Sequence, residues 1–540
     1  MPFRRVTATL TAAVLAAALI PLAPASASPA LAWGACPSDA ASPANALPLS
    51  AYQCASLAVP LSYQDPVGPE TQIAVGRLPA VDQAHKLGTL FYNPGGPGNP
   101  GRIPPVLTPA LHQRFDLVGF DPRGVGASTQ AHCFTSPDQL AVLQRVAAQF
   151  PITPEQTTQQ IADALTIDDL CARNAGPLFS HMSTADVARD LDRLRAAVGS
   201  STLSYYGLSY GTVLGETYVN LFPERVRAVV LDAVDDPVNW TTGYRPADVN
   251  VPFSVRLGAD LGAQQAFRSF LSACAATTRC AFNTSGANLA DKYNQVLDHL
   301  YADGPVTIAD PATGQPITVR YQDVIAHIVH TLDDAGNSPA LAEYLQLVST
   351  ATQTPPAATV TAAPITTLLD RLSSDGPVAI ANPADPAPAT PISTPFDSLL
   401  GGGATQCADA RNPSDPAVWP RFAAATDQRA RGFGPYYTYL SLPCVRFPSA
   451  DPDHYAGPWN RHTANPVLLL GNSQGDPDTP YPGAQRTAKL LGNAELLTLN
   501  TFGHGSLNHS RCVDDAVDAY FLRLRPPAAD TVCQPDKAPF

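Results

Sequence analysis

A chain of 540 residues with 45% hydrophobic residues is long enough for two or three domains, or for one large domain with an insertion. Only 15% of its residues are charged, and the formal net charge is -13. This acidic balance argues against nucleic acid or an anionic membrane surface as a partner.

The N-terminus has the pattern of a secretory signal. Two arginines precede a short apolar run at residues 12–20, and Ala25-Ser26-Ala27 matches a cleavage site. This run is too short to span a bilayer, and no later stretch is long and apolar enough to do so. Scarce lysine with abundant alanine and proline is typical of a GC-rich bacterial genome. We therefore expect residues 1–27 to be removed and the mature protein to be extracellular and bacterial.

The ten cysteines fit an exported chain, because disulfides persist in oxidising compartments. Sequence alone does not fix their connectivity. Proximity along the chain favours neighbouring couples: Cys36 with Cys54, Cys133 with Cys171, Cys274 with Cys280, Cys407 with Cys444, and Cys512 with Cys533. No Cys-x-x-Cys occurs, and no acidic or cysteine residue completes a metal-ligand set with His327 and His330. We therefore expect no metal and no cofactor.

The first expected elements are strands at residues 57–63, 71–78 and 89–92. The third runs into the glycine-rich loop 93–98, which lacks the Gly-Lys-Ser/Thr ending of a phosphate loop. A further strand is expected at 115–120. A helix is expected at residues 184–198, whose apolar side chains share one face, and another strand at 226–231. Alternating strands and helices predict a mainly parallel sheet with helices on both faces.

Between these last two elements lies the stretch around Ser209. A β-prone run leads into Gly207-Leu208-Ser209-Tyr210-Gly211, and a helix expected to end before Pro223 follows. A strand that reverses sharply into a helix needs small residues on both sides of the bend, because a Cβ there would clash. Such a turn exposes the serine hydroxyl on a strained tip, as in the nucleophile elbow of the α/β-hydrolase fold.

The strand–helix rhythm stops at residue 237 and resumes at residue 463. We expect an inserted, mostly helical cap at 237–462 between a first core part, 28–236, and a second, 463–540. Residues 354–395 form a loop rich in proline and alanine that is broken by an expected helix at 365–372. Within the cap we also expect helices at residues 263–275, 289–301, 321–332 and 339–351. After it, strands are expected at residues 466–470 and 495–499.

A serine nucleophile needs a general base, which a carboxylate orients. In this fold the order along the chain is Ser, Asp, His. Asp476 and His504 each lie just beyond a strand of the second core part, where α/β sheets place their sites. We assign Ser209 as nucleophile, Asp476 as orienting acid and His504 as base, with Asp478 as the rival acid. Activity should then rise as His504 deprotonates, near its ordinary pKa of about 6.5.

The oxyanion formed on attack needs preorganised N–H donors. One donor should be the backbone N–H of Tyr210, directly after the nucleophile. The other should come from the loop after the third strand. Pro97 has no N–H, so Gly96 is our choice and Gly95 the reserve.

Several motifs together resemble the secreted tripeptidyl aminopeptidase family of actinobacteria, α/β-hydrolases related to proline iminopeptidases. The similarity spans nearly all of the expected mature chain, least securely in the cap. It rests on residues 93–98, 115–126, 184–191, 207–211 and 476–480, and on Cys512 and Cys533. Residues 99–102 depart from the small residues usual there, at the mouth of the expected site.

This resemblance implies a serine exopeptidase that releases short peptides, with a tripeptide as the expected product, from substrates with a free N-terminus. It also implies a triad of Ser209, Asp476 and His504, and an oxyanion hole of Tyr210 and Gly96. Members described as carboxylesterases share the chemistry, so an esterase acting on acyl or secondary-metabolite esters is the alternative. A binding protein that kept only the fold is a third reading, which the ordered triad disfavours. The sequence leaves the oligomeric state open.

Overall fold

The computed structural model describes residues 31–540 except 39, 41–42, 44–45, 149, 285, 287, 311–313, 354–362, 365–396 and 449–450. The expected signal peptide, 1–27, and the helix expected at 365–372 lie outside these residues. The ten cysteines lie inside them and form the five neighbouring couples that the sequence favours. No helix in the described part of the chain combines the length and apolarity needed to cross a bilayer.

The described residues form a ten-stranded sheet in the order β1-β2-β3-β5-β4-β6-β7-β11-β12-β13. The pairs β1–β2, β2–β3 and β3–β5 are antiparallel, and every later pair is parallel, which confirms the expected mainly parallel sheet. The strands are β1 (Gly34–Ala35), β2 (Gln53–Pro60), β3 (Glu70–Leu78), β4 (Gly88–Asn93), β5 (Phe115–Phe120), β6 (Leu203–Leu208), β7 (Val226–Asp232), β11 (Val467–Asn472), β12 (Ala494–Leu499) and β13 (Val532–Cys533).

Helices cover both faces of this sheet because successive strand residues point to opposite sides. In β11, Val467 and Leu469 pack on one face while Leu468 and Leu470 pack on the other. The first face is covered by α4 (Thr184–Ala197), α5 (Tyr210–Leu221) and α16 (Tyr481–Leu490). The second is covered by α1 (Pro109–Arg114) and α17 (Arg511–Arg523). The central strands are therefore buried on both sides, which explains their nearly continuous apolar sequences.

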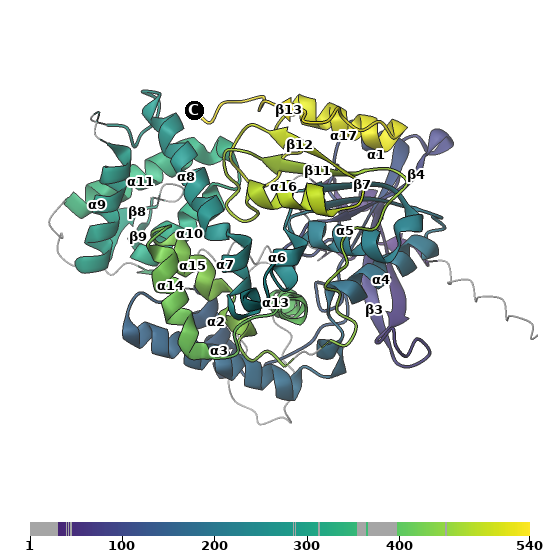
Figure 1. Ribbon diagram of the computed structural model, residues 1–540, viewed down its shortest axis with the longest axis horizontal. Coiled ribbons are helices and arrows are strands. Elements are labelled where there is room, and N and C mark those ends of the chain that lie inside the picture. Colours follow the sequence, from purple (N-terminus) through teal and green to yellow (C-terminus); the bar gives the residue numbers. More distant parts are fainter. Residues whose placement is uncertain are drawn as a thin grey trace, which may run out of the picture.

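A second, mostly helical lobe lies beside the sheet (Figure 1) and has its own hydrophobic core. It also contains the small sheet β10-β9-β8, in which β8 and β9 pair antiparallel. The strands are β8 (Val306–Ala309), β9 (Pro316–Val319) and β10 (Ala363–Pro364). The helices between β7 and β11 are α6 (Pro237–Thr241), α7 (Phe253–Leu257), α8 (Ala259–Ala275), α9 (Leu289–Ala302), α10 (Tyr321–Thr331), α11 (Ser338–Gln353), α13 (Asp397–Asp409), α14 (Trp419–Asp427) and α15 (Phe433–Leu440).

Two helices that precede Ser209 in the chain also belong to the second lobe. α2 (Pro137–Ala148) and α3 (Pro154–Asn174) lie beneath α14 in Figure 1. Phe150, between them, is buried in the core of the second lobe and packs edge-on against Tyr321 of α10. The division of the chain at 237 and 463 stays a proposal, and α2 and α3 extend the proposed cap towards the N-terminus.

Candidate active site

Ser209 occupies the sharp turn between β6 and α5, at the carboxyl end of a central strand. Its backbone has φ 58° and ψ -129°, a conformation in which a residue other than glycine is strained. A Cβ at Gly207 would collide with the backbone carbonyl of Gly211, and a Cβ at Gly211 would come 2.9 Å from the Asn93 oxygen. The two glycines thus give the bend the room that a sharp strand-to-helix reversal needs.

Asp476 and His504 meet at the same edge of the sheet. Asp476 follows β11, is 1% exposed and accepts a hydrogen bond from His504 Nδ1 at 2.9 Å. The same Asp476 oxygen accepts the backbone N–H groups of Asp478 and Thr479 at 2.9 Å, and Thr479 Oγ1 donates to the other oxygen at 2.8 Å. The carboxylate is therefore fixed by its own loop. Because Nδ1 of His504 donates its proton to this carboxylate, Nε2 is the ring nitrogen that can accept a proton.

Asp478, the rival acid, is placed differently. Its Oδ1 accepts a hydrogen bond from the Tyr437 hydroxyl at 2.8 Å, and its backbone N–H donates to Asp476. The described residues include no hydrogen bond between Asp478 and His504. The geometry therefore favours Asp476 as the acid that orients the imidazole.

Asp232, at the end of β7, links the serine turn to the histidine loop. Its backbone oxygen accepts the Ser209 N–H at 2.9 Å. Its Oδ2 accepts the N–H groups of Ser506 and Leu507 at 2.9 and 3.0 Å. In the described part of the chain the Ser209 hydroxyl has no hydrogen-bond partner, so its pairing with His504 stays a proposal. In enzymes without bound substrate, the distance between the catalytic serine and histidine often exceeds hydrogen-bond length.

The glycine-rich loop 93–98 lies against the serine turn through Gly95. Gly95 packs so closely there that an added Cβ would lie 2.8 Å from Ser209 Cβ and 3.2 Å from the Tyr210 nitrogen. Its own N–H donates to Asn93 Oδ1 at 3.0 Å, so Gly95 is poorly placed to serve as the reserve donor. Neither Gly96 N–H nor Tyr210 N–H has an acceptor among the described residues. Both N–H groups therefore remain candidates for the oxyanion hole.

The second lobe contacts three of the loops that carry this site. The backbone carbonyl of Asp333, just after α10, accepts the His504 N–H at 2.8 Å, and Asp334 forms an antiparallel bridge with Gly503. Gly262 of α8 lies against the Asp476 carbonyl so closely that a Cβ would collide with it. Gly402 of α13 lies equally close to the carbonyl of Pro97. Segments of the lobe thus touch the acid, the base and the glycine-rich loop.

Three carboxylates set the basicity of His504. Burial by itself lowers the pKa of the imidazole. The hydrogen-bonded Asp476 carboxylate, together with Asp478 and Asp333, outweighs burial and raises the pKa well above its ordinary value of 6.5. The unperturbed value expected from the sequence therefore does not apply.

The pH dependence of turnover should follow this shift. The base must be neutral to take a proton from serine, so activity should be lost as pH falls through the raised pKa. We expect the acid limb of kcat/KM to have its midpoint above pH 6.5. Replacing Asp478 by asparagine removes a negative charge while keeping an acceptor for Tyr437, so the limb should move to lower pH. A midpoint at or below 6.5, or one that Asp478→Asn does not move, would contradict this account.

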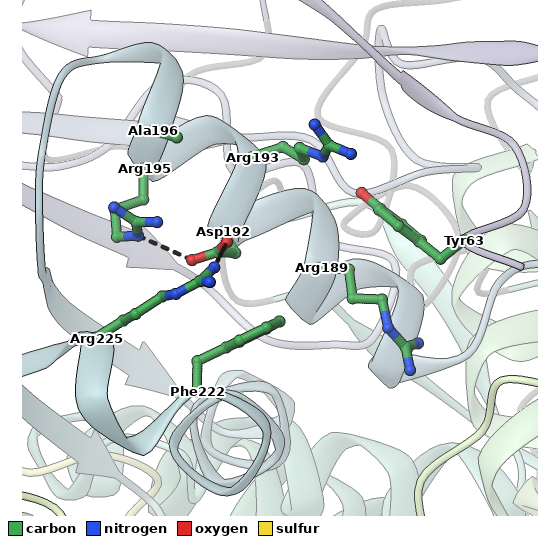
Figure 2. Close-up of a pocket in the computed structure, with 8 residues that line it drawn as sticks. All are labelled: Tyr63, Arg189, Asp192, Arg193, Arg195, Ala196, Phe222 and Arg225. Carbon is green, nitrogen blue, oxygen red and sulfur yellow. Dashed lines mark hydrogen bonds and ion pairs between the residues drawn. The ribbon is translucent and has the colours of Figure 1, made fainter. Parts of the chain in front are cut away.

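The surface also carries an arginine-rich pocket of 560 Å³ that shares no residue with the proposed site. Figure 2 shows Arg189, Arg193 and Arg195 projecting from α4, with Arg225 opposite. Asp192 pairs with two of these guanidinium groups, those of Arg195 and Arg225. A single negative charge in the pocket is therefore shared between two of its four arginines.

Sequence reasoning did not find Asp232, Asp333 or Gly402. Asp232 is a carboxylate at the carboxyl end of a strand, the same signal that identified Asp476, so it could have been found. Asp333 and Gly402 reach the site only through packing of the second lobe. No local pattern marks them.

Two family models match the chain. The model of the α/β-hydrolase fold matches residues 88–280, and the model of the TAP-like protein matches residues 428–533. The first match contains the glycine-rich loop and Ser209, and the second contains Asp476 and His504. Both halves of the proposed site thus fall within matched segments.

Three relatives show the range of similarity. The chain is 28% identical over 504 residues to a tripeptidyl aminopeptidase of Streptomyces lividans, covering 90% of this chain and 84% of that protein. It is 30% identical over 501 residues to a carboxylesterase B of Mycobacterium tuberculosis, covering 89% and 86%. It is 35% identical over 287 residues to the serine protease Hip1 of the same species, and this match spans about half of either chain, 52% of each.

Proposed function

Because the chain belongs to the tripeptidyl aminopeptidase-like family of α/β-hydrolases, we propose that it is a secreted serine exopeptidase that releases short peptides from free N-termini. The observation that carries the proposal is the Asp476–His504 hydrogen bond beside the Ser209 turn. The disulfides support export, because such bonds persist in oxidising compartments.

In the proposed reaction, Ser209 Oγ attacks the scissile carbonyl carbon while His504 Nε2 takes the hydroxyl proton. Asp476 holds the imidazole in place and stabilises its positive charge. The N–H groups of Tyr210 and Gly96 meet the developing oxyanion. His504 then gives its proton to the leaving amine, and water hydrolyses the acyl-enzyme with His504 again as base.

The proposed cap supports an exopeptidase, because it touches the loops that carry Asp476, His504 and Pro97 and so restricts what extends beyond the acyl group. A substrate with a free N-terminus brings an ammonium group that needs a partner when buried. Asp333 of the cap is our candidate for that partner. Its Oδ1 is buried with no hydrogen-bond donor among the described residues, and its carboxylate interacts electrostatically with His504 and Asp478.

The pKa of Asp333 is consistent with this role. Burial, with the neighbouring Asp478 carboxylate, raises this pKa well above its ordinary value of 3.8. An uncompensated carboxylate there is costly, and a bound ammonium would compensate it.

An esterase is the second candidate function. The relative named carboxylesterase B is as extensively similar to this chain as the aminopeptidase. A triad of this kind cleaves esters and amides by the same steps. The free amine of the substrate is what separates the two proposals.

A panel of matched substrates tests the choice. Tripeptide p-nitroanilides with a free amine, their N-acetylated counterparts and p-nitrophenyl esters should be assayed side by side, with mono- and dipeptide anilides to measure length preference. We expect the free tripeptide to be cleaved and acetylation to lower kcat/KM by about 10²-fold, because a buried charged pair is lost. Equal turnover of free and acetylated peptides would exclude the aminopeptidase.

Asp333→Asn extends the same test. If Asp333 meets the ammonium, the substitution should raise KM for free tripeptides and leave ester hydrolysis nearly unchanged, with both measured at a pH above the acid limb, where His504 is neutral with or without the Asp333 charge. Asp334→Asn is the matched control, because Asp334 instead accepts the Gly336 N–H at 2.7 Å. An equal loss on both substrate classes would remove Asp333 from this role while leaving the hydrolase proposal intact.

A further inference from the structure

Four side chains outside the proposed active site converge where the chain returns from the cap to the sheet. His181 and Asp186 lie around the start of α4, and Asp451 and Asp453 lie in the segment before β11. Each offers one possible ligand atom, and these atoms all lie within 4.8 Å of one another. In chain order the two pairs are far apart, so only the fold brings them together.

Three atoms of this cluster are buried without a hydrogen-bond partner among the described residues. They are His181 Nδ1, Asp186 Oδ2 and Asp453 Oδ2. The Asp186 side chain is completely buried. Buried polar atoms are nearly always paired, because an unpaired one costs about 1–3 kcal/mol. Three unpaired polar atoms on the side chains of one cluster that contains three carboxylates indicate a missing positive partner.

Hydrogen bonds to the carboxylates of Asp451 and Asp453 hold these side chains in place. Asp451 Oδ2 accepts the Ser183 N–H and its Oδ1 accepts the Asp453 N–H, both at 2.8 Å. Asp453 Oδ1 accepts from Gln64 Nε2 at 3.2 Å. Such outer hydrogen bonds orient the side chains that bind a metal ion.

Neighbouring arginines do not complete the cluster. Arg123 lies 3.5 Å from Asp186 Oδ2, but it is already bonded to both oxygens of Asp190, at 2.6 and 2.7 Å. Arg189, which lines the neighbouring pocket in Figure 2, reaches Asp186 Oδ1 only at 3.5 Å. Three carboxylates therefore share weak compensation in a largely buried place.

We propose that His181, Asp186, Asp451 and Asp453 bind one divalent transition-metal cation, Zn²⁺ or Mn²⁺. Imidazole nitrogen with carboxylate oxygens suits these ions, whereas Ca²⁺ and Mg²⁺ prefer oxygen ligands throughout. The spread of the donor atoms fits ligands around a single ion after small adjustments. The cation joins the start of α4 to the segment that returns from the cap, and so stabilises their junction.

The test measures metal content and thermal unfolding of the full-length mature protein. After treatment with EDTA, the protein is equilibrated with Zn²⁺, Mn²⁺, Ca²⁺ or Mg²⁺ and passed through a desalting column. We expect about one equivalent of Zn²⁺ or Mn²⁺ to be retained and the Tm to rise by about 3–5 °C, because only the folded state holds the ligands together. Retention of neither ion, or a rise with Ca²⁺ or Mg²⁺ alone, would overturn the proposal.

Asp453→Asn keeps the side-chain shape and removes the charge of one ligand. We expect it to fold with an unchanged Tm in EDTA and to lose both the bound metal and the metal-dependent rise. Asp169→Asn, at an exposed aspartate of α3, is the matched control and should retain both. If Asp453→Asn does not fold, His181→Gln provides the same comparison. Metal retained equally by these variants and by the unmodified protein would place it elsewhere and refute the site.

Discussion

Replacing Ser209 by alanine is expected to lower kcat by about 10⁶-fold, the loss seen when a triad nucleophile is removed. The substitution deletes only Oγ, because alanine keeps the Cβ that already occupies the strained conformation at φ 58°. The Ser209 hydroxyl has no hydrogen-bond partner among the described residues, so no structural bond is lost. We therefore expect unchanged Tm and unchanged substrate binding, with turnover alone abolished.

A matched control separates nucleophile loss from a general effect at this edge of the sheet. Ser473 directly follows β11 and donates a hydrogen bond to Asn500 at 3.2 Å. Ser473→Ala should retain kcat within a few-fold, because it removes a hydroxyl that has no part in the reaction. Substantial turnover by Ser209→Ala, measured with the tripeptide anilide, would eliminate Ser209 as nucleophile.

Replacing Asp476 by asparagine is expected to lower kcat by about 10⁴-fold, as when the carboxylate of a triad becomes an amide. The amide can donate to His504 Nδ1, which favours the wrong tautomer and withdraws the charge that stabilises the imidazolium. The same oxygen position also accepts the N–H groups of Asp478 and Thr479, so an amide nitrogen placed there would lose both of these bonds. We therefore expect a moderate loss of stability beside the much larger loss of activity.

Asp478→Asn provides the comparison within the same loop. It should change kcat at its pH optimum by less than about 10-fold and act mainly on the pH profile, because Asp478 reaches His504 only through its charge. A larger loss from Asp478→Asn than from Asp476→Asn would reverse the assignment of the orienting acid.

Much of the sheet could be predicted from the sequence because its signals are local. Residues 115–120 are mostly apolar, with Asp116 as the exception, and a turn follows them; β5 spans the same residues. The helix expected at 184–198 is α4, Thr184–Ala197. Its apolar residues recur at helical spacing, and this pattern alone predicts both the helix and the face that it buries.

The proposed cap was harder to predict in detail. Residues 306–309 and 316–319 form the hairpin-like pair β8–β9, which the expected helical pattern did not include. These strands are only four residues long, too short for alternation to stand out. The placement of α2 and α3 beside the cap depends on contacts such as Phe150 with Tyr321, which no sequence periodicity encodes.

In the proposed active site, too, the features with local sequence signals could be predicted and those that depend on tertiary packing could not. Ser209, Asp476 and His504 each follow a strand, so chain order and topology sufficed to select them. The pKa of His504 is raised first by the charge of Asp476, but the further contribution of Asp333 could not be predicted, because the proposed cap brings Asp333 in from more than 100 residues before. The cluster that contains His181 and Asp451 could not be predicted either, because only the fold brings these two distant segments together. Neither of its segments has ligand spacing of its own.

The identity of the residue modified by a fluorophosphonate tests the central claim most directly. Trypsin should release Ser209 in the peptide of residues 196–225, bounded by Arg195 and Arg225, and fragmentation of that peptide locates the adduct. We predict one adduct per chain on Ser209, formed faster as His504 deprotonates and absent from Ser209→Ala. An adduct on another serine, or unchanged labelling of Ser209→Ala, would contradict the account.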